Sequence, residues 1–276
     1  MSEECNHDCA NCAKKKDGGC SDPKSFQVAA NSKSRIDKVI AVMSGKGGVG
    51  KSLVTEQLAV AAAKRGLKTA ILDADITGPS IPMAFGVNER AVGDADKNIL
   101  PSRSACGIGI MSLNLLVENP EDPVAWRGPV IAGVVKQFWS DVAWGDVDIM
   151  FVDMPPGTGD VPLTVFQSLP ITGAVIVTTP QDLVSMIVEK AARLADMMKI
   201  PVLGLVENMS AFKCPDCGKV HRIFGEGDAA NLAAQHGIKS VASLPIDPSV
   251  AAAVDRGAIE SVDVSALDPI LDALVG

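Results

Sequence analysis

The sequence lacks several features that mark particular classes of protein. Basic residues are in the minority, 25 against 33 acidic ones, and the formal net charge of −8 argues against electrostatic binding to nucleic acid or anionic lipid. No run approaches the about 18 consecutive apolar residues of a membrane span. The N-terminus has no apolar segment of the kind found in signal peptides. We therefore expect a cytoplasmic protein with no nucleic-acid and no membrane partner.

Length and composition favour one catalytic domain with an appendage. Of the 276 residues, 47% are hydrophobic, which suffices for a sizeable core. Residues 1–35 are polar, with little periodicity, and we expect them to form a short Cys-rich metal-binding extension and a linker. Residues 36–276 alternate between apolar strands and helices.

This alternation predicts an α/β fold, a mostly parallel sheet with helices on both faces, as in P-loop NTPases. The expected strands are Val39–Met43, Thr69–Leu72, Ile108–Ser112, Ile149–Val152, Ala174–Thr178, Val202–Val206 and Val241–Leu244. The expected helices include one starting near Gly50, and others at Ile131–Trp139, Ser185–Met198 and Ala229–His236. In such sheets, ligands bind beyond the carboxyl ends of the strands.

One eight-residue segment carries a phosphate-binding motif. Gly45-Lys46-Gly47-Gly48-Val49-Gly50-Lys51-Ser52 fits G-x-x-x-x-G-K-[ST] and lies between an apolar strand and a helix. Its glycines let backbone N–H groups approach phosphate oxygens, and the helix N-terminus attracts the anion. We expect Lys51 on the β- and γ-phosphates and the Ser52 hydroxyl on Mg²⁺.

A second lysine, Lys46, follows the first glycine of this motif. Lys51 alone suffices to neutralise the phosphates of the loop's own nucleotide. Lys46 can therefore reach outward to a nucleotide held by a second subunit, which predicts a homodimer.

Two acidic motifs follow apolar strands and complete the predicted nucleotide site. The first contains Asp73 and Asp75, followed by Gly-Pro, and indicates a switch loop near the γ-phosphate. The second starts at Asp153, which we expect to reach Mg²⁺ through water. In the same motif, Gly157 can present a backbone N–H to the γ-phosphate. For Asp73 and Asp160, capping of a helix or loop is an alternative role.

The spacing of Cys214 and Cys217 lets both sulfurs face one metal ion or cluster. Metal binding is the usual use of paired cysteines in a reducing compartment, although a redox disulfide is an alternative. A tetrahedral zinc or iron–sulfur site needs four ligands. His221 is one candidate for a third, and a second subunit that supplies two more thiolates is the more economical solution.

Four further cysteines, Cys5, Cys9, Cys12 and Cys20, lie close enough together to close a site within one chain. Either a 4Fe–4S cluster or structural zinc satisfies them, with His7 as an alternative ligand, while free thiols in a disordered segment are the third possibility. We expect the remaining cysteine, Cys106, to be an ordinary buried thiol.

Together these motifs resemble the Mrp/ApbC-type iron–sulfur carrier P-loop ATPases. That family belongs with MinD, ParA and the nitrogenase iron protein to the group with a deviant phosphate loop. The resemblance runs from about Lys38 to the C-terminus and also includes Glu207-Asn208-Met209-Ser210. The four-cysteine segment resembles the extension of eukaryotic-type cytosolic members, but its spacing differs.

The resemblance implies an ATPase whose Lys46 reaches the nucleotide of the opposite subunit. Lys51 and Ser52 would hold the phosphates and Mg²⁺, Asp75 would orient or activate the attacking water, and Asp153 would lie in the Mg²⁺ shell.

It further implies that Asn208 contacts the adenine ring. Cys214 and Cys217 would bind a labile 4Fe–4S cluster that bridges two subunits, and a second 4Fe–4S cluster is expected at the N-terminus. The expected function is an ATP-hydrolysing scaffold that delivers the cluster to apo iron–sulfur proteins.

Three other functions remain open on the sequence. The chain can be an ATP-dependent electron-transfer reductase, a zinc-stabilised dimeric regulatory ATPase, or a partitioning switch. The cysteines in one C-x-x-C segment argue against the first, and the acidic charge argues against the last.

Overall fold

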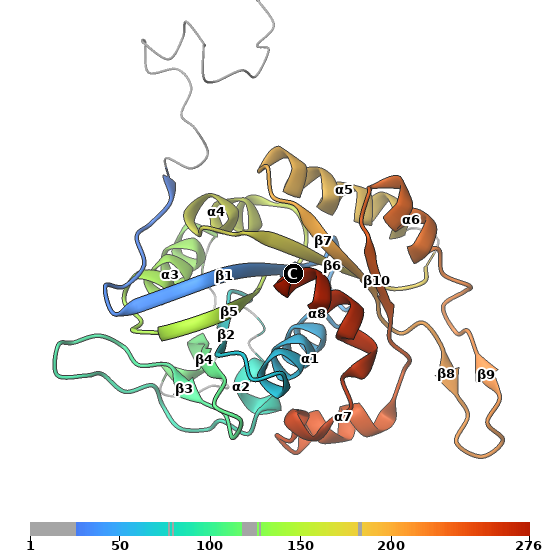
Figure 1. Cartoon of the computed structure of the whole chain (residues 1–276), viewed down its shortest axis with the longest axis horizontal. Helices are drawn as coiled ribbons and strands as arrows, with labels where there is room; N and C mark the ends of the chain where they lie inside the picture. Colours follow the sequence, from blue (N-terminus) through green and yellow to red (C-terminus); the bar gives the residue numbers. More distant parts are fainter. Residues whose placement is uncertain (1–25, 77, 79, 118–125, 127, 182–183) are drawn as a thin grey trace, which may run out of the picture.

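The computed structural model describes residues 26–276 except 77, 79, 118–125, 127 and 182–183. Its centre is an eight-stranded sheet with the order β10-β7-β6-β1-β5-β2-β4-β3, parallel throughout except for β3 with β4. The strands of this sheet are β1 (Ser34–Met43), β2 (Thr69–Asp73), β3 (Ser102–Arg103), β4 (Gly109–Met111), β5 (Gly145–Asp153), β6 (Gly173–Thr178), β7 (Val202–Glu207) and β10 (Ser240–Ser243). A separate antiparallel pair, β8 (Phe212–Lys213) and β9 (Val220–His221), projects beyond the β10 edge (Figure 1).

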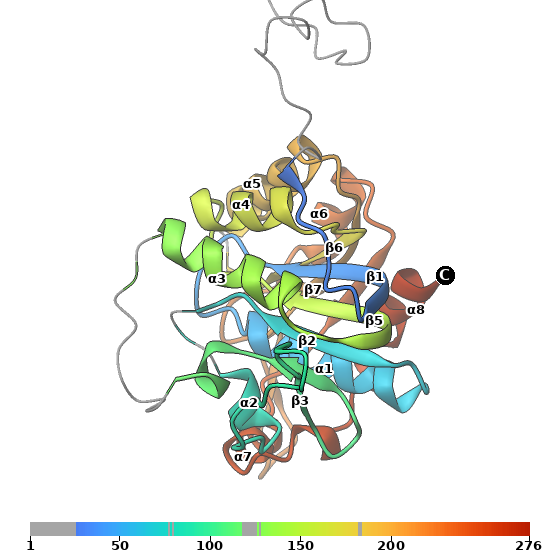
Figure 2. The same cartoon turned by 90° about the vertical axis from the view of Figure 1, so that its left-hand side faces the viewer.

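Helices cover both faces of the sheet (Figures 1 and 2). One face carries α1 (Lys51–Lys64), α2 (Ile81–Ala84), α7 (Pro248–Asp255) and α8 (Asp268–Val275). The other face carries α3 (Gly128–Ser140), α4 (Asp160–Ser168), α5 (Val184–Met197) and α6 (Ala229–Gln235). Three-residue 3₁₀ turns lie at Leu113–Leu115, Ile259–Ser261 and Ser265–Leu267.

The central strand β1 shows why the strands are almost continuously apolar. Val39, Ala41 and Met43 enter the core beneath α3–α6, whereas Ile40 and Val42 enter the core beneath α1 and α8. A strand covered on both sides has no polar face. The expected sheet, its seven apolar strands and the named helices are therefore confirmed, with small shifts at their ends.

Among the described residues, no helix is both long and apolar enough to span a membrane.

The chain begins to pack on the domain before residue 36, where we expect the linker to end. The Val28 N–H donates to the Ser168 carbonyl at 2.9 Å, and the Trp139 indole N–H donates to the Val28 carbonyl at 2.9 Å. The Asn31 amide donates to the Ser140 carbonyl at 3.2 Å. Since β1 starts at Ser34, the expected boundary near residue 36 falls inside a strand.

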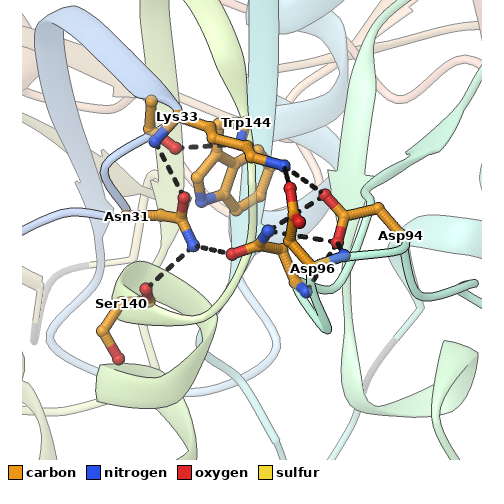
Figure 3. Close-up of polar contacts among 8 residues, drawn as sticks. Asn31, Lys33, Asp94, Asp96, Ser140 and Trp144 are labelled. Atoms are coloured by element: carbon orange, nitrogen blue, oxygen red, sulfur yellow. Dashed lines mark hydrogen bonds and ion pairs between the residues drawn. The ribbon is translucent and has the colours of Figure 1, made fainter.

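A polar network next to this segment fixes the start of β1 (Figure 3). The Lys33 ammonium lies 2.7 Å from the Asp94 carboxylate and 2.5 Å from that of Asp96. Asp94 also accepts N–H bonds from the backbones of Asp96 and Asn98, both at 2.9 Å. The hydrogen bond from Lys33, followed by those from Asn98, holds the pKa of Asp94 well below its usual range.

Cys106 is exposed, and the expectation of a buried thiol is wrong. The residue lies in a tight turn, closed by a 2.9 Å hydrogen bond from the Gly107 N–H to the Ser104 carbonyl. The turn precedes β4 instead of belonging to it, so the apolar run after Cys106 is buried and Cys106 is not.

We expect Asp94→Asn to lower the thermal midpoint by a few degrees at pH 7. An acid whose pKa is depressed by folding stabilises the protein above its unfolded pKa, and that contribution disappears as the pH falls through the folded value. The difference between the two proteins should therefore persist from pH 7 down to about pH 4, near the unfolded pKa of aspartate, and shrink as the pH falls further in calorimetric scans. Asp146→Asn is the matched control, because Asp146 lies 3.6 Å from Lys68 in an exposed pair that contributes little. Equal losses in both variants at pH 7 would contradict the special role of the network.

Candidate functional site

The phosphate loop turns sharply between β1 and α1. Gly48 and Gly50 have φ of 78° and 77°, in the left-handed region that side chains disfavour. A Cβ added at Gly50 would come within 2.2 Å of the Asn208 amide nitrogen. That amide donates to the Val49 carbonyl at 2.9 Å, so Asn208 braces the loop from β7.

The Asp153 carboxylate, at the end of β5, is the centre of the polar contacts behind the loop. It accepts hydrogen bonds from the Lys51 ammonium at 2.7 Å, the Ser52 hydroxyl at 2.6 Å and the Thr55 hydroxyl at 2.9 Å. Asp153 is 1% exposed and the Lys51 side chain 6%. Lys51 also lies 3.5 Å from Asp75. The predicted loop lysine, loop serine and both strand-end aspartates thus meet at one point.

More carboxyl groups surround Lys51 than its single charge balances. Asp73 pairs with Asp153 across β2 and β5 and accepts hydrogen bonds from the Asp75 N–H and the Ser112 hydroxyl. Burial, reinforced by the Asp153 charge, raises the pKa of Asp73 to about 8. Burial and the charges of Asp153 and Asp73 also raise the pKa of Glu56 well above its ordinary value. Asp73 therefore favours the protonated form at neutral pH, and burial shifts the pKa of Glu56 in the same direction.

Other predicted residues of the loop region have partners within this chain. The Lys46 ammonium binds the Gln181 side-chain oxygen, and the Gly157 N–H donates to the Ser44 carbonyl at 2.9 Å. Asp160 lies in the first turn of α4. A phosphate contact to the Gly157 N–H would have to replace the Ser44 contact.

A cavity of about 480 Å³ adjoins the loop on the α1 side. Its walls are mostly apolar, and we call it the base pocket because its size and its place beside the loop suit a nucleotide base. It is lined by Leu53, Gln57, Asn208, Met209, Phe224, Leu244, Pro245, Ile246, Asp247, Val250, Ala251, Asp263, Ser265 and Ala266.

Residues 212–221, the cysteine hairpin, carry the thiol pair. The Cys214 N–H donates to the Lys219 carbonyl and the Gly218 N–H to the Cys214 carbonyl, both at 2.9 Å. The backbone N–H groups of Cys217 and Asp216, together with the Cys217 thiol, lower the pKa of Cys214. Both thiols are free, Cys217 is exposed and Cys214 half-buried. The pair is therefore accessible, and the lowered pKa favours the thiolate form of Cys214.

Within the described part of the chain, no three His, Cys, Asp or Glu side chains gather where they could hold a metal ion. His221 is therefore not placed as a third ligand beside Cys214 and Cys217. Cys5, Cys9, Cys12, Cys20 and His7 lie outside the described residues, as do Thr77 and Pro79 of the first acidic motif.

Sequence reasoning missed Thr55 and most of the base pocket. Thr55 lies one helical turn after Lys51, a spacing that places both on one side of α1 and gives a usable signal. The base pocket gave no sequence signal, because its walls come from α1, the end of β7, the segment after β9, the loop before α7, α7 itself and the turn around Ser265.

Comparison with known proteins gave consistent matches. The sequence model of one family, described as "ParA: NUBPL iron-transfer P-loop NTPase", matches residues 35–274. A Clostridium perfringens protein named iron-sulfur cluster carrier protein is 44% identical, over 91% of this chain and 93% of its own. A protein of the same name from Methanocaldococcus jannaschii is 42% identical, over 92% and 89%. The solved structure of a nucleotide-binding protein from Archaeoglobus fulgidus in complex with ADP is 44% identical, with a TM-score of 0.76 over 84% of this chain and 91% of its own.

We expect Asp73→Asn to stabilise the nucleotide-free protein increasingly as the pH rises from 5.5 to 8. When folding raises the pKa of an acid, the folded state retains a proton that the unfolded state releases, so stability falls with pH between the two pKa values. Asparagine removes this dependence. The thermal midpoint of the variant should gain roughly 2–4 °C or more on that of the wild type across this range. A difference in midpoint that is the same at both pH values would contradict a protonated Asp73.

Proposed function

The chain belongs to the ParA-type family of NUBPL iron-transfer P-loop NTPases, and from that premise we propose that it is an ATP-hydrolysing carrier of iron–sulfur clusters. In this proposal two subunits assemble a labile 4Fe–4S cluster and deliver it to apoproteins. The observation that carries the proposal is the presence of two separate sites in one domain: a phosphate loop, and a thiol pair that has only half the ligands of a cluster among the described residues.

At the phosphate loop, Lys51 is the cation for the β- and γ-phosphates. Its ammonium is already desolvated and oriented by Asp153, so moving it onto phosphate exchanges one anionic partner for another. Asp75 is partly exposed and lies 3.5 Å from Lys51, which supports a role in orienting the water that attacks the γ-phosphate.

The same site suits Mg²⁺. The Ser52 hydroxyl and the Asp153 carboxylate are oxygen ligands 2.6 Å apart, of the type that Mg²⁺ accepts together with phosphate oxygens and water. Mg²⁺ would there neutralise charge on the phosphates while Lys51 and the loop N–H groups hold them.

The proposed dimer rests on two features that each need a second subunit: Lys46 and the Cys214/Cys217 pair. Lys46 contacts Gln181 and none of the carboxylates around Lys51, which supports a role outside its own phosphate site. Cys214 and Cys217 supply two thiolates, and a two-fold axis brings the second pair from an identical hairpin. The loops after Asp75 and Asp153 would then sense the γ-phosphate and shift the subunits, which gates the cluster.

The remaining assignments complete the proposal. Asn208 contacts the adenine ring at the edge of the base pocket. The four N-terminal cysteines hold a second 4Fe–4S cluster in a separate extension. The chain acts in the cytoplasm, where reduced thiols persist.

A complementation test addresses Lys46. Lys46→Ala and Lys51→Ala homodimers should each hydrolyse ATP at least about 100-fold more slowly than wild type, since phosphoryl transfer depends on charge neutralisation. In a mixed dimer, the Lys46→Ala subunit keeps its own Lys51 and receives Lys46 from its partner. An equimolar mixture should therefore recover roughly one quarter of the wild-type rate. No recovery, despite confirmed subunit exchange, would show that Lys46 acts within its own subunit.

Anaerobic reconstitution tests the cargo. After incubation with iron and sulfide, a chain that starts at Phe26 should bind about four irons per dimer, and the full chain about four more per subunit. Cys214→Ser/Cys217→Ser should abolish the first set and the transfer of cluster to an apo acceptor. Cys106→Ser, which removes an exposed thiol elsewhere, is the matched control. Zinc without sulfide, or wild-type transfer by the double variant, would refute the carrier.

A further inference from the structure

The base pocket and the cysteine hairpin share their walls. Phe224, three residues after β9, lines the base pocket. On the other limb, the Ile246 N–H donates to the Ala211 carbonyl at 2.7 Å, and Ile246 pairs with Phe212 of β8. Both ends of the hairpin therefore meet the cavity beside the phosphate loop.

The segment that enters the hairpin, residues 208–212, continues the β7 strand and is hydrogen-bonded to residues 244–246. The Leu244 N–H donates to the Glu207 carbonyl, and the Ser210 N–H donates to the Leu244 carbonyl, both at 2.9 Å. Leu244 and Ile246 are pocket walls, and Cys214 follows Phe212 by two residues. Main-chain hydrogen bonds thus connect this wall to the strand that leads to the cysteines.

The segment that leaves the hairpin, residues 222–228, is anchored at its far end by Glu207 of β7. The Glu207 carboxylate accepts N–H bonds from Asp228 and Ala229 at the start of α6. At Gly227, φ is 68° and an added Cβ would lie 2.3 Å from that carboxylate, so the turn is tightly packed. Between this anchor and β9, the half-buried Phe224 is the side chain that faces the pocket.

We infer that Phe224 is a positioning residue through which the nucleotide base sets the accessibility of the Cys214/Cys217 pair. A purine ring packed on the Phe224 ring orders the segment that leaves the hairpin, and the same ring presses on the Leu244–Ile246 wall that holds the segment that enters it. The inference rests on the proposed carrier function and adds to it. In this inference the base controls the accessibility of the two thiols. Since the base is present in ADP as well as ATP, this control does not require the γ-phosphate.

The test compares ADP with inorganic tripolyphosphate, which has phosphates but no base. The readout is the rate of iodoacetamide alkylation of Cys214 and Cys217 in the reduced, cluster-free full chain, resolved by peptide mass spectrometry with Cys106 as internal reference. ADP should slow alkylation of the pair roughly twofold or more in the wild type, whereas tripolyphosphate should not.

Phe224→Ala should abolish the ADP effect and raise KM for ATP about three- to tenfold, with kcat nearly unchanged, because it removes an aromatic contact to the base and leaves the phosphate site intact. Phe224→Tyr, which keeps the ring, should restore both. Ile223→Ala is the matched control, since its neighbouring side chain is 58% exposed and outside the pocket.

ADP protection that persists in Phe224→Ala, or protection of the wild type by tripolyphosphate alone, would overturn the inference. Because the alkylation assay contains no cluster, its result is independent of the carrier function. Failure of iron and sulfide to bind the wild type would refute the carrier, whereas the alkylation rates would still decide the role of Phe224.

Discussion

The buried ion pair between Lys51 and Asp153 organises the site. A buried pair is worth its desolvation only when further hydrogen bonds satisfy both partners. Here Ser52 and Thr55 supply those bonds to Asp153, while the raised pKa values of Asp73 and Glu56 oppose the ionisation of two further carboxyl groups. The position of β5 relative to α1 is thereby fixed by charge as well as by packing. Because Lys51 and Ser52 belong to the phosphate loop, the position of the loop is fixed by the same contacts.

Much of this arrangement could be predicted from the sequence, because the informative signals are local. The apolar run in β1, the glycines after it and Lys51-Ser52 lie within a few residues of one another, and the two strand-end aspartates follow from the parallel sheet. Cys106 shows the limit of such signals: its apolar neighbours suggest burial, but a turn places it outside the strand. The base pocket shows another, because Leu53, Asn208, Phe224 and Ile246 come together only through the folded sheet edge.

Asn208 joins the two chemical centres of the domain. One side-chain nitrogen braces the phosphate loop at Val49, while its backbone begins the segment that leads to the cysteine hairpin. Because Asn208 also packs closely against Gly50, the phosphate loop and the end of β7 have no free space between them. The cysteine hairpin lies at the β10 edge, so a short stretch of backbone joins Asn208, beside the phosphate loop, to the two thiols.

The distribution of the three tryptophans gives the domain its own optical reporters. Tyrosine is absent, so tryptophan dominates the fluorescence even when it is excited at the maximum of protein absorption. Trp139 and Trp144 are 3% and 1% exposed, and their indole N–H groups are bonded to Val28 and Phe138, whereas Trp126, just before α3, is 42% exposed. A collisional quencher should therefore reduce the emission of the exposed Trp126 and leave that of the buried Trp139 and Trp144 nearly unchanged. Detachment of the segment around Val28 would register as a red shift of the shielded emission, without any label.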